Sequence, residues 1–536
     1  MNPKTIVTLA IGLILFLLPF FIELEGLSLT GHITLGIFLL AALFWILEPI
    51  PIYATSLLVI FLQIIFLSVQ GPLYQLGQVP ATGPEPVEAE VWRIPAEALQ
   101  EGEVLLLLDE DRQTSEIAVT VLDRDNGLVT VESAELTADT RLVLDADHWL
   151  LDFDVPSYTS YLNSLANPII ILFLGGFVLA SAAVKYRLDR NLTRVILRPF
   201  GTRPAMVMLG LMLVTATLSA FMSNTATAAM MMTVIIPIVT QLDPADRYRI
   251  GIALCIPFAA NVGGIATPIG TPPNAIVIGA LQANDVFITF GTWMMLAVPL
   301  VAVLLFFVWW LLLKVYPPKE EKIVLEMSGK FDLSAKAIIL YVVFGLTVVL
   351  WVTEAVHGLA SSVVAFLPIA ALTACQVIEK EDIRNLSWEV LWLMAGGIAL
   401  GVAMQQTGLA DYMIGLIRWE LMGAFLVIIV FGFVAAGLSN FISNTVAASL
   451  LVPLAITLGA SGILAEGVSV EINAIIIAVG ASLGMALPIS TPPNAIAMST
   501  GMLRTPDMAR MGIVIGIVGL VIALALSRVL WPALGL

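Results

Sequence analysis

The chain is poor in charged side chains and nearly lacks histidine and cysteine. Of its 536 residues, 12% are charged, three are His and two are Cys. A soluble domain carries about 25% charged residues, so a water-soluble globule is excluded, and two cysteines exclude a disulfide scaffold. No basic stripe lies outside short loops, which excludes nucleic acid as a partner. Because 59% of the residues are hydrophobic, the composition predicts a polytopic protein embedded in membrane lipid.

The net charge of −16 is concentrated in one segment. Residues 72–156 carry 19 acidic and 4 basic side chains, whereas the other 451 residues carry 21 and 20. Within this segment the alternating runs Glu116–Val121 and Leu128–Val131 flank Asn126-Gly127, which is a strong signal for a β-hairpin. We therefore expect a small acidic β domain at 72–156, inserted into a loop.

Eleven apolar runs are each near the ~20 residues that a helix needs to cross a membrane. Two longer runs, 206–241 and 424–458, hold about 35 residues each and have polar residues at their midpoints. That length is too great for one span and too small for two full ones, so each run predicts a re-entrant hairpin of two helices. The eleven runs lie at 5–22, 31–48, 54–70, 162–182, 249–280, 291–313, 337–356, 362–378, 389–405, 470–500 and 511–530.

The chain contains an internal duplication. Leu218–Thr225 matches Leu438–Thr445 at an offset of 220, and Thr271–Ile276 matches Thr491–Ile496 at the same offset. The first copy makes an odd number of crossings, so the second enters the membrane upside down, an arrangement typical of secondary transporters. About 85 extra residues in the first copy coincide with the acidic insert. The expected all-α organisation is N-terminal spans at 1–70, the insert at 72–156, the rest of the first repeat at 157–313, a cytoplasmic linker at 314–336 and the second repeat at 337–536.

The Lys and Arg residues indicate an orientation in the membrane. With a cytoplasmic N-terminus and eleven crossings, 18 of the 20 basic residues outside the insert lie on the cytoplasmic side, and Arg418 and Arg528 lie on the other. The positive-inside rule therefore predicts a multi-pass protein of the cell (inner) membrane, with residues 72–156 and the C-terminus outside the cytoplasm.

Each predicted hairpin has a Ser-Asn-Thr tripeptide at its midpoint, beginning at Ser223 and at Ser443. Ser219 and Ser439 lie four residues earlier, one turn back on the same helix face. Their hydroxyl and amide oxygens are hard, neutral ligands that suit an alkali cation. The alternative is that these residues only join helices by hydrogen bonds, but two copies at matched positions favour a binding site.

A Thr-Pro-Pro-Asn motif interrupts two of the spans, at 271–274 and at 491–494. Proline is disfavoured inside a helix but accepted in its first turn, so Thr271 and Thr491 are expected to begin a second half-helix. Such an N-terminus would direct free N–H groups and a positive dipole end at an anion. The preceding half-helices end at Gly270 and Ser490, whose carbonyl oxygens would suit a cation. A plain proline kink is the alternative.

Asp, Glu, Lys, Arg and His are absent from 206–241, 250–280 and 472–500. A proton-relay pump would place such groups there, so neutral oxygens and helix ends favour a cation and an anion that bind together. Neither HExxH nor GxSxG occurs, and the three His residues are isolated. We therefore expect no enzyme and no organic cofactor.

The paired motifs closely resemble the divalent anion/sodium symporter family, over about 31–70 and 157–530. The resemblance implies a homodimer, an elevator-type movement and two Na⁺ sites; the family core lacks an external β domain. The implied sodium ligands are Ser219, Ser223, Asn224 and the Gly270 carbonyl in one site, and Ser439, Ser443, Asn444 and the Ser490 carbonyl in the other. The implied anion contacts are Ser223, Asn224, Thr225, Ser443, Asn444 and Thr445, near Thr491 and Pro492, with Thr271 as the matching half-helix start.

Together these observations predict sodium-coupled symport of a small divalent anion. C4-dicarboxylates such as succinate are the leading substrates, because both tips retain Ser-Asn-Thr. A symporter of sulfate or another inorganic divalent anion, and a sodium-independent dicarboxylate exchanger, stay open. A channel or receptor in which the acidic insert senses a ligand is the rival from another class.

Overall fold

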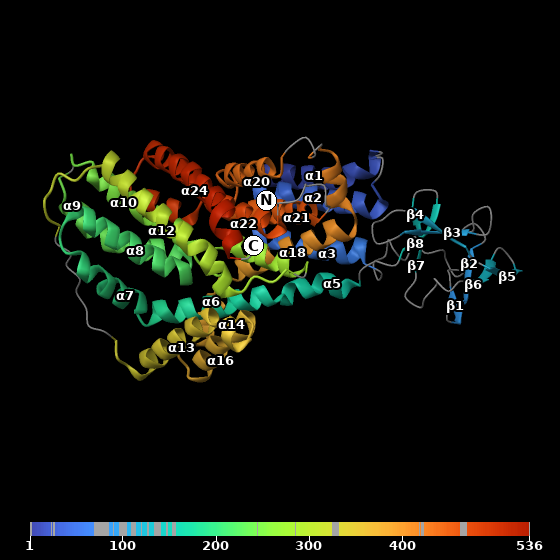
Figure 1. The fold of residues 1–536 in the computed structure, drawn as a ribbon, viewed down its shortest axis with the longest axis horizontal. Helices are drawn as coiled ribbons and strands as arrows, with labels where there is room; N and C mark the ends of the chain where they lie inside the picture. Colours follow the sequence, from blue (N-terminus) through green and yellow to red (C-terminus); the bar gives the residue numbers. More distant parts are fainter. Residues whose placement is uncertain are drawn as a thin grey trace. The chain divides into compact units, whose positions relative to one another are not determined.

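Figure 1 shows the chain as a computed structural model, which is predominantly helical. It describes residues 3–22, 24, 27–68, 157–243, 245–284, 286–323, 332–417, 419, 423–460 and 469–534, together with the backbone of eight strands between 85 and 152. The chain folds into two compact units, one comprising Met1–Leu165 and Ala399–Ile417 and the other Ala166–Ile398 and Arg418–Leu536.

The helices of the first unit pack in sequence order. Helix α1 packs on α2, α2 on α3, and α3 on α5, while α19 packs on α2. The indole N–H of Trp45, which is 1% exposed, donates to the Ser56 hydroxyl at 3.2 Å and joins α2 to α3. The helices are α1 (Pro3–Leu17), α2 (Leu29–Leu47), α3 (Ile52–Leu67), α5 (Tyr158–Asn163) and α19 (Leu409–Gly415).

Eight strands in the acidic segment form two four-stranded sheets, in the orders β1-β2-β6-β5 and β4-β3-β8-β7. The predicted hairpin pairing across Asn126-Gly127 is confirmed, because Asp125 pairs with Leu128 in antiparallel strands. The first arm was predicted as one strand, Glu116–Val121, and this was wrong: it is divided between β4 and β5, which belong to different sheets. The strands are β1 (Glu85–Glu88), β2 (Val91–Pro95), β3 (Val104–Leu108), β4 (Thr114–Ala118), β5 (Thr120–Asp125), β6 (Leu128–Glu132), β7 (Arg141–Asp145) and β8 (His148–Asp152).

The second unit contains both predicted hairpins and both predicted helix breaks. Its helices are α6 (Pro168–Lys185), α7 (Leu188–Leu197), α8 (Pro204–Phe221), α9 (Asn224–Gln241), α10 (Tyr248–Gly264), α11 (Pro272–Gln282), α12 (Phe290–Val315), α13 (Ala335–Val352), α14 (Glu354–His357), α15 (Ser361–Val364), α16 (Phe366–Ala374), α17 (Lys380–Arg384), the first part of α18 (Trp388–Gln406), α20 (Ala424–Ser439), α21 (Asn444–Ala460), α22 (Val470–Ser482), α23 (Pro492–Ser499) and α24 (Thr505–Ala533).

Nine helices in the described part of the chain are long and apolar enough to cross a membrane. They include α8 and α9, the arms of the first hairpin, each 18 residues and therefore about 27 Å long at 1.5 Å per residue. The expectation of two short arms was therefore wrong for this hairpin, since either arm is long enough to cross. The count of eleven crossings and the depth of the hairpin tips stay predictions.

Short elements around α6 were not foreseen from the sequence. The predicted span 362–378 is divided at Ala365 into α15 and α16, and both pack against α6. A Cβ on Gly175 would lie 2.6 Å from the carbonyl oxygen of Ala365, so the approach of these segments requires glycine. The amphipathic helix α7 was also missed, because its three Arg and Asp residues interrupt the apolar pattern.

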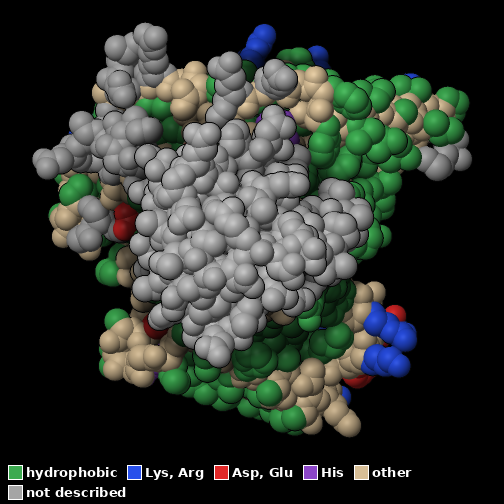
Figure 2. Space-filling view, turned by 90° about the vertical axis from the view of Figure 1, so that its right-hand side faces the viewer, with side chains coloured by type: hydrophobic (Ala, Val, Ile, Leu, Met, Phe, Trp, Pro, Cys, Tyr) green, Lys and Arg blue, Asp and Glu red, His purple; other side chains and the backbone are tan. Residues whose placement is uncertain are grey.

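Apolar side chains cover much of the described surface on the face drawn in Figure 2, and Lys and Arg lie at its margins. Large apolar residues are exposed on the long helices, among them Phe306, Val342 and Val521, which are 61%, 62% and 53% exposed. A surface of this kind is stable when lipid covers it.

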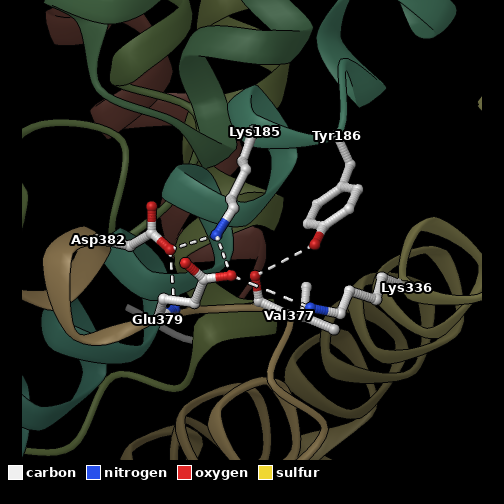
Figure 3. A network of polar contacts seen from close by, with 6 residues as sticks. All are labelled: Lys185, Tyr186, Lys336, Val377, Glu379 and Asp382. Carbon is white, nitrogen blue, oxygen red and sulfur yellow. Dashed lines mark hydrogen bonds and ion pairs between the residues drawn. The ribbon is translucent and has the colours of Figure 1, made fainter.

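An ion-pair network joins the end of α6 to α17 and the start of α13 (Figure 3). The Lys185 ammonium lies 2.6 Å from Asp382 Oδ2 and 3.6 Å from Glu379 Oε1, and Lys336 reaches Glu379 at 4.0 Å. The Asp382 carboxylate also accepts from the Glu379 backbone N–H at 2.8 Å. Partial burial opposes ionisation of Asp382, but these hydrogen bonds and the Lys185 charge outweigh it and lower the pKa of Asp382.

Asp382→Asn is expected to lower thermal stability at pH 7 by about 1 kcal/mol or less, because the pair is partly exposed. A carboxyl group whose pKa is lowered by folding stabilises the protein at pH values above its unfolded pKa of ~3.9. This stabilisation is lost as the pH falls through the pKa of the folded state. The difference between variant and parent melting temperatures should therefore vanish in strong acid. Glu381→Gln is the matched control, since the Glu381–Arg384 pair is 70% and 61% exposed. An equal effect of both variants at pH 7 would contradict the assignment.

Candidate functional site

The first hairpin turns at its Ser-Asn-Thr tripeptide. Helix α8 ends at Phe221 and α9 begins at Asn224. Ser223 is the N-cap, and its carbonyl accepts from the Thr227 N–H at 2.9 Å while its side chain makes no cap bond. Within the described residues, no partner accepts from the N–H groups in the first turn of α9. The tip therefore presents unpaired backbone donors at the positive end of a helix, which is the geometry of an anion site.

The second hairpin repeats this arrangement. Helix α20 ends at Ser439 and α21 begins at Asn444, and the Ser443 carbonyl accepts from the Ala447 N–H at 3.0 Å. The first-turn N–H groups of α21 likewise have no partner among the described residues. The chain thus contains two similar helix N-termini that can bind anionic groups.

Beside the first tip, three oxygen atoms lie close together. The Ser219 hydroxyl, 0% exposed, lies 2.5 Å from Asn224 Oδ1 and 2.7 Å from the Ala260 carbonyl. A Cβ on Gly264 would lie 2.6 Å from Asn224 Oδ1, and one on Gly270 would lie 2.4 Å from the Gly264 carbonyl oxygen. Ser219 and Asn224 are therefore in contact, and Gly270 lies beside Gly264, which in turn lies beside Asn224.

The second tip has the corresponding oxygens. The Ser439 hydroxyl, also 0% exposed, lies 2.5 Å from Asn444 Oδ1 and 2.6 Å from the Ala481 carbonyl. Ser490 is held at the same tip, because its hydroxyl donates to the Asn440 carbonyl at 3.1 Å. Each serine hydroxyl has one proton for two acceptors, so each cluster has more oxygens than donors. Neutral oxygens in this arrangement suit a hard monovalent cation.

Both Thr-Pro-Pro-Asn motifs separate two helices, so they are breaks and not simple kinks. Helix α10 ends at Gly264 before α11 begins at Pro272, and α22 ends at Ser482 before α23 begins at Pro492. Thr491 accepts from the Asn494 N–H at 3.4 Å, as predicted for an N-cap. Thr271 occupies the corresponding position but makes no side-chain cap bond.

The expectation of free N–H groups at these two half-helices was wrong. The first two residues of α11 and of α23 are prolines, which have no N–H. The third N–H is used in both, by Asn274 to the Thr271 carbonyl at 3.2 Å and by Asn494 to Thr491. The unpaired donors lie instead at the hairpin tips, in the first turns of α9 and α21.

The asparagine side chain of each motif hydrogen-bonds to backbone carbonyls within the same helix break. Asn274 Nδ2 donates to the Gly264 and Thr267 carbonyls at 3.1 and 2.8 Å. Asn494 Nδ2 donates to the Met485 and Leu487 carbonyls at 2.8 and 3.0 Å. Carbonyls that lose helical partners are therefore satisfied by a side chain, as an apolar environment requires.

The two repeats also interlock. Helix α9 packs on α23, and α21 packs on α11, so each Ser-Asn-Thr helix lies against the Thr-Pro-Pro-Asn helix of the other repeat. Asn261 Nδ2 donates to Thr491 Oγ1 at 3.1 Å and to Asn494 Oδ1 at 3.2 Å. The sequence analysis missed Asn261; its signal is a lone amide within the apolar run of α10.

The predicted anion contacts differ in exposure. Thr225 is exposed, whereas Thr445 is 7% exposed. Thr271 and Thr491 are each 3% exposed, and Pro492 is exposed. The tip residues Ser223, Asn224, Ser443 and Asn444 are half-buried. The two tips are therefore alike in hydrogen bonding and unlike in access.

Apolar spanning helices around uncharged, broken-helix sites define a multi-pass membrane transporter. Residues 142–480 match the family model described as a citrate transporter, CitMHS. An uncharacterized transporter of Haemophilus influenzae is 31% identical over 69% of this chain and 82% of its own length. The sodium-dependent dicarboxylate transporter SdcS of Staphylococcus saprophyticus is 30% identical over 69% and 78%. The sodium-dependent high-affinity dicarboxylate transporter 3 of Caenorhabditis elegans is 29% identical over 66% and 72%.

The chain therefore belongs to the CitMHS citrate transporter family, among the divalent anion/sodium symporters that its motifs resemble. Its family and relatives are transporters and not enzymes.

Asn261→Ala is expected to destabilise the protein by about 1–3 kcal/mol, because it leaves Asn494 Oδ1 buried without a donor. Thermal unfolding of the purified protein in detergent measures the loss. Asn385→Ala, at an exposed asparagine outside the site, is the control. Equal melting temperatures for the two variants would show that the link between the repeats contributes nothing.

Proposed function

We propose that the chain couples the entry of Na⁺ to the uptake of a divalent anion, and that C4-dicarboxylates such as succinate are its substrates. The observation that carries the proposal is the pairing at each hairpin tip of unpaired helix N–H groups with an adjacent cluster of neutral oxygens. The names of relatives from Staphylococcus and Caenorhabditis support both the coupling ion and the substrate class.

The anion site consists of the two tips. A dicarboxylate has two carboxylates, and the first turns of α9 and α21 supply two sets of N–H donors. The side chains of Ser223, Asn224 and Thr225 contact one carboxylate, and those of Ser443, Asn444 and Thr445 contact the other. Thr271, Thr491 and Pro492 line the site at the half-helix starts.

The sodium sites are the two oxygen clusters. One uses Ser219, Ser223, Asn224 and the Gly270 carbonyl; the other uses Ser439, Ser443, Asn444 and the Ser490 carbonyl. Because 206–241, 250–280 and 472–500 contain no Asp, Glu, Lys, Arg or His, the protein itself does not neutralise a dianion there. Sodium ions supply the compensating charge, which makes joint binding favourable and separate binding costly.

We also propose a transport cycle and an oligomeric state. The inverted repeats move the site across the membrane by an elevator-type alternating-access mechanism, in a homodimer. The N-terminus lies in the cytoplasm, and residues 72–156 and the C-terminus lie outside.

Uptake of radiolabelled succinate into proteoliposomes, with and without an inward Na⁺ gradient, tests the proposal. Gradient-dependent uptake is expected, with sulfate and citrate as unlabelled competitors. Uptake that needs internal dicarboxylate and no Na⁺ would make the chain an exchanger. If succinate is not taken up and sulfate competes for its residual binding, the substrates are inorganic divalent anions.

Asn224→Ala and Asn444→Ala should each lower sodium-driven uptake by about 10-fold or more, because each removes an oxygen from a cluster and a side chain from the anion site. Uptake at increasing Na⁺ concentration, normalised to protein in the vesicles, measures the loss. Asn385→Ala is the matched control. Normal uptake by both site variants would refute the site.

Replacing residues 72–156 by a short flexible linker should leave uptake within about twofold of the parent, because the second repeat closes the corresponding loop without an insert. Helices α3 and α5, on either side of the insert, pack together and keep the ends close. Loss of uptake in a variant that stays monodisperse would assign the insert a role in transport.

A further inference from the structure

The first residues of α12 contact the end of α13 and the start of α14. The Glu354 carboxylate accepts from the Phe290 N–H at 3.2 Å. The Phe290 ring, 1% exposed, stacks on the buried ring of Trp351, with centroids 4.9 Å apart and an interplanar angle of 12°. A Cβ on Gly291 would lie 3.0 Å from the Val352 carbonyl oxygen. The start of α12 is therefore fixed by a hydrogen bond, a ring contact and a close backbone approach.

Glu354 supplies a negative charge that the first turn of α12 lacks. Helix α12 is 26 residues long and has no acidic residue in its first turn, although a helix N-terminus favours negative charge. The corresponding helix of the second repeat, α24, has Asp507 in its own first turn. Glu354 is half-buried and lines an opening of about 90 Å³, together with Pro268 of the first break and Ile278 of α11. An opening of this size admits water, which allows a carboxylate to stay charged beside apolar walls.

One turn further along, α12 contacts the first helix break. The indole N–H of Trp293 donates to the Ile265 carbonyl at 3.0 Å. This carbonyl follows the end of α10 directly, and it also accepts from Asn274 Nδ2 at 3.4 Å. The preceding residue, Gly264, lies against Asn224, because a Cβ there would be 2.6 Å from Asn224 Oδ1. A continuous set of contacts therefore joins the start of α12 to the first oxygen cluster.

The second repeat contains a corresponding contact. Ile265 and Met485 match at an offset of 220, and the Met485 carbonyl accepts from Asn494 Nδ2 at 2.8 Å. A Cβ on Gly512 of α24 would lie 2.5 Å from the same carbonyl oxygen. In each repeat, the helix that follows the break thus contacts a carbonyl inside the break. The residue types differ between the repeats, so the contact itself is the shared feature.

We propose that Glu354 is a positioning residue for the first sodium site. By fixing the start of α12, it keeps Trp293 on the Ile265 carbonyl and keeps the break in the geometry that the ion needs. Glu354 belongs to neither oxygen cluster, and the inference rests on the proposed function for the identity of the ion. Without this hydrogen bond, part of the free energy of Na⁺ binding is spent on ordering the break, so the affinity for Na⁺ falls.

Uptake by the full-length protein in proteoliposomes, measured over a range of Na⁺ concentrations, tests the inference. Glu354→Leu keeps the approximate size of the side chain and removes the acceptor. It should raise the half-saturating Na⁺ concentration by about 10-fold, with little change in the maximal rate. Glu354→Gln retains an oxygen that can accept from Phe290, so its half-saturating concentration should stay within about twofold of the parent value.

Glu48→Leu is the matched control. Glu48 corresponds to Glu354 in the first repeat, at an offset of 306. It is exposed, and its side chain makes no hydrogen bond with any described residue. If Glu354→Leu does not fold, Glu354→Asp replaces it, because a side chain one methylene shorter keeps the charge but withdraws it from Phe290. The same rise in half-saturating Na⁺ concentration is then expected.

A second variant distinguishes positioning from a general loss of stability. Trp293→Phe removes the indole donor and keeps an aromatic ring, and it should raise the half-saturating Na⁺ concentration by a similar factor. Combined with Glu354→Leu it should add little, since both changes act on the Ile265 carbonyl. Independent damage would instead multiply, to about 100-fold.

An unchanged Na⁺ dependence in Glu354→Leu, an equal shift in Glu48→Leu, or multiplied effects in the double variant would each overturn the inference. All three results leave sodium-driven uptake by the parent intact, so they are distinguishable from failure of the proposed function. A parent protein whose uptake does not depend on Na⁺ would overturn both.

Discussion

Every polar backbone group in an apolar environment needs a partner within the protein, and the two helix breaks are where this constraint is hardest to meet. Asn274 and Asn494 meet it by donating to the carbonyls of their own breaks. Each break thereby becomes a fixed element of structure. Gly264 is held against Asn224, and Ser490 is held at the second tip through Asn440. The geometry of both oxygen clusters depends on these two side chains.

The same constraint separates the chemistry of the two motifs. A helix that begins with two prolines has few N–H donors, so α11 and α23 can begin close to carbonyl oxygens without attracting an anion. The helices that begin with Asn-Thr retain their first-turn donors. Under the proposed function, the anion therefore binds at the hairpin tips and the cations bind at the oxygens beside them. Because neither region carries a charged side chain, binding of an ion of one sign favours binding of the other.

Local features of the site were predictable from the sequence, and long-range ones were not. Paired prolines after Thr271 and Thr491 predicted the breaks, because proline acts on its own turn. Ser219 and Ser439 were predicted to lie one turn before Ser223 and Ser443, and the structure places their hydroxyls 2.5 Å from Asn224 and Asn444 Oδ1. Asn261 was missed because its partners lie 230 and 233 residues away, and no periodicity reveals such a contact.

Other errors had physical causes of the same kind. The run Glu116–Val121 alternates throughout, but its first part pairs with β3 and its last part with β6, so it is divided between two sheets. The free donors were assigned to the wrong helices, since the dipole argument ignored the missing N–H of proline. The unequal exposure of Thr225 and Thr445 had no sequence signal, because the two tripeptides are identical.

Two kinds of inequality thus coexist between the repeats. Thr225 and Thr445 are chemically identical, so their unequal exposure comes from the conformation and not from the residue type. The direct link from Asn261 to Thr491 and Asn494 has no counterpart among the described residues of the other half, where Asn274 Oδ1 has no partner. This second inequality comes from the residue types, so a change of conformation alone does not remove it.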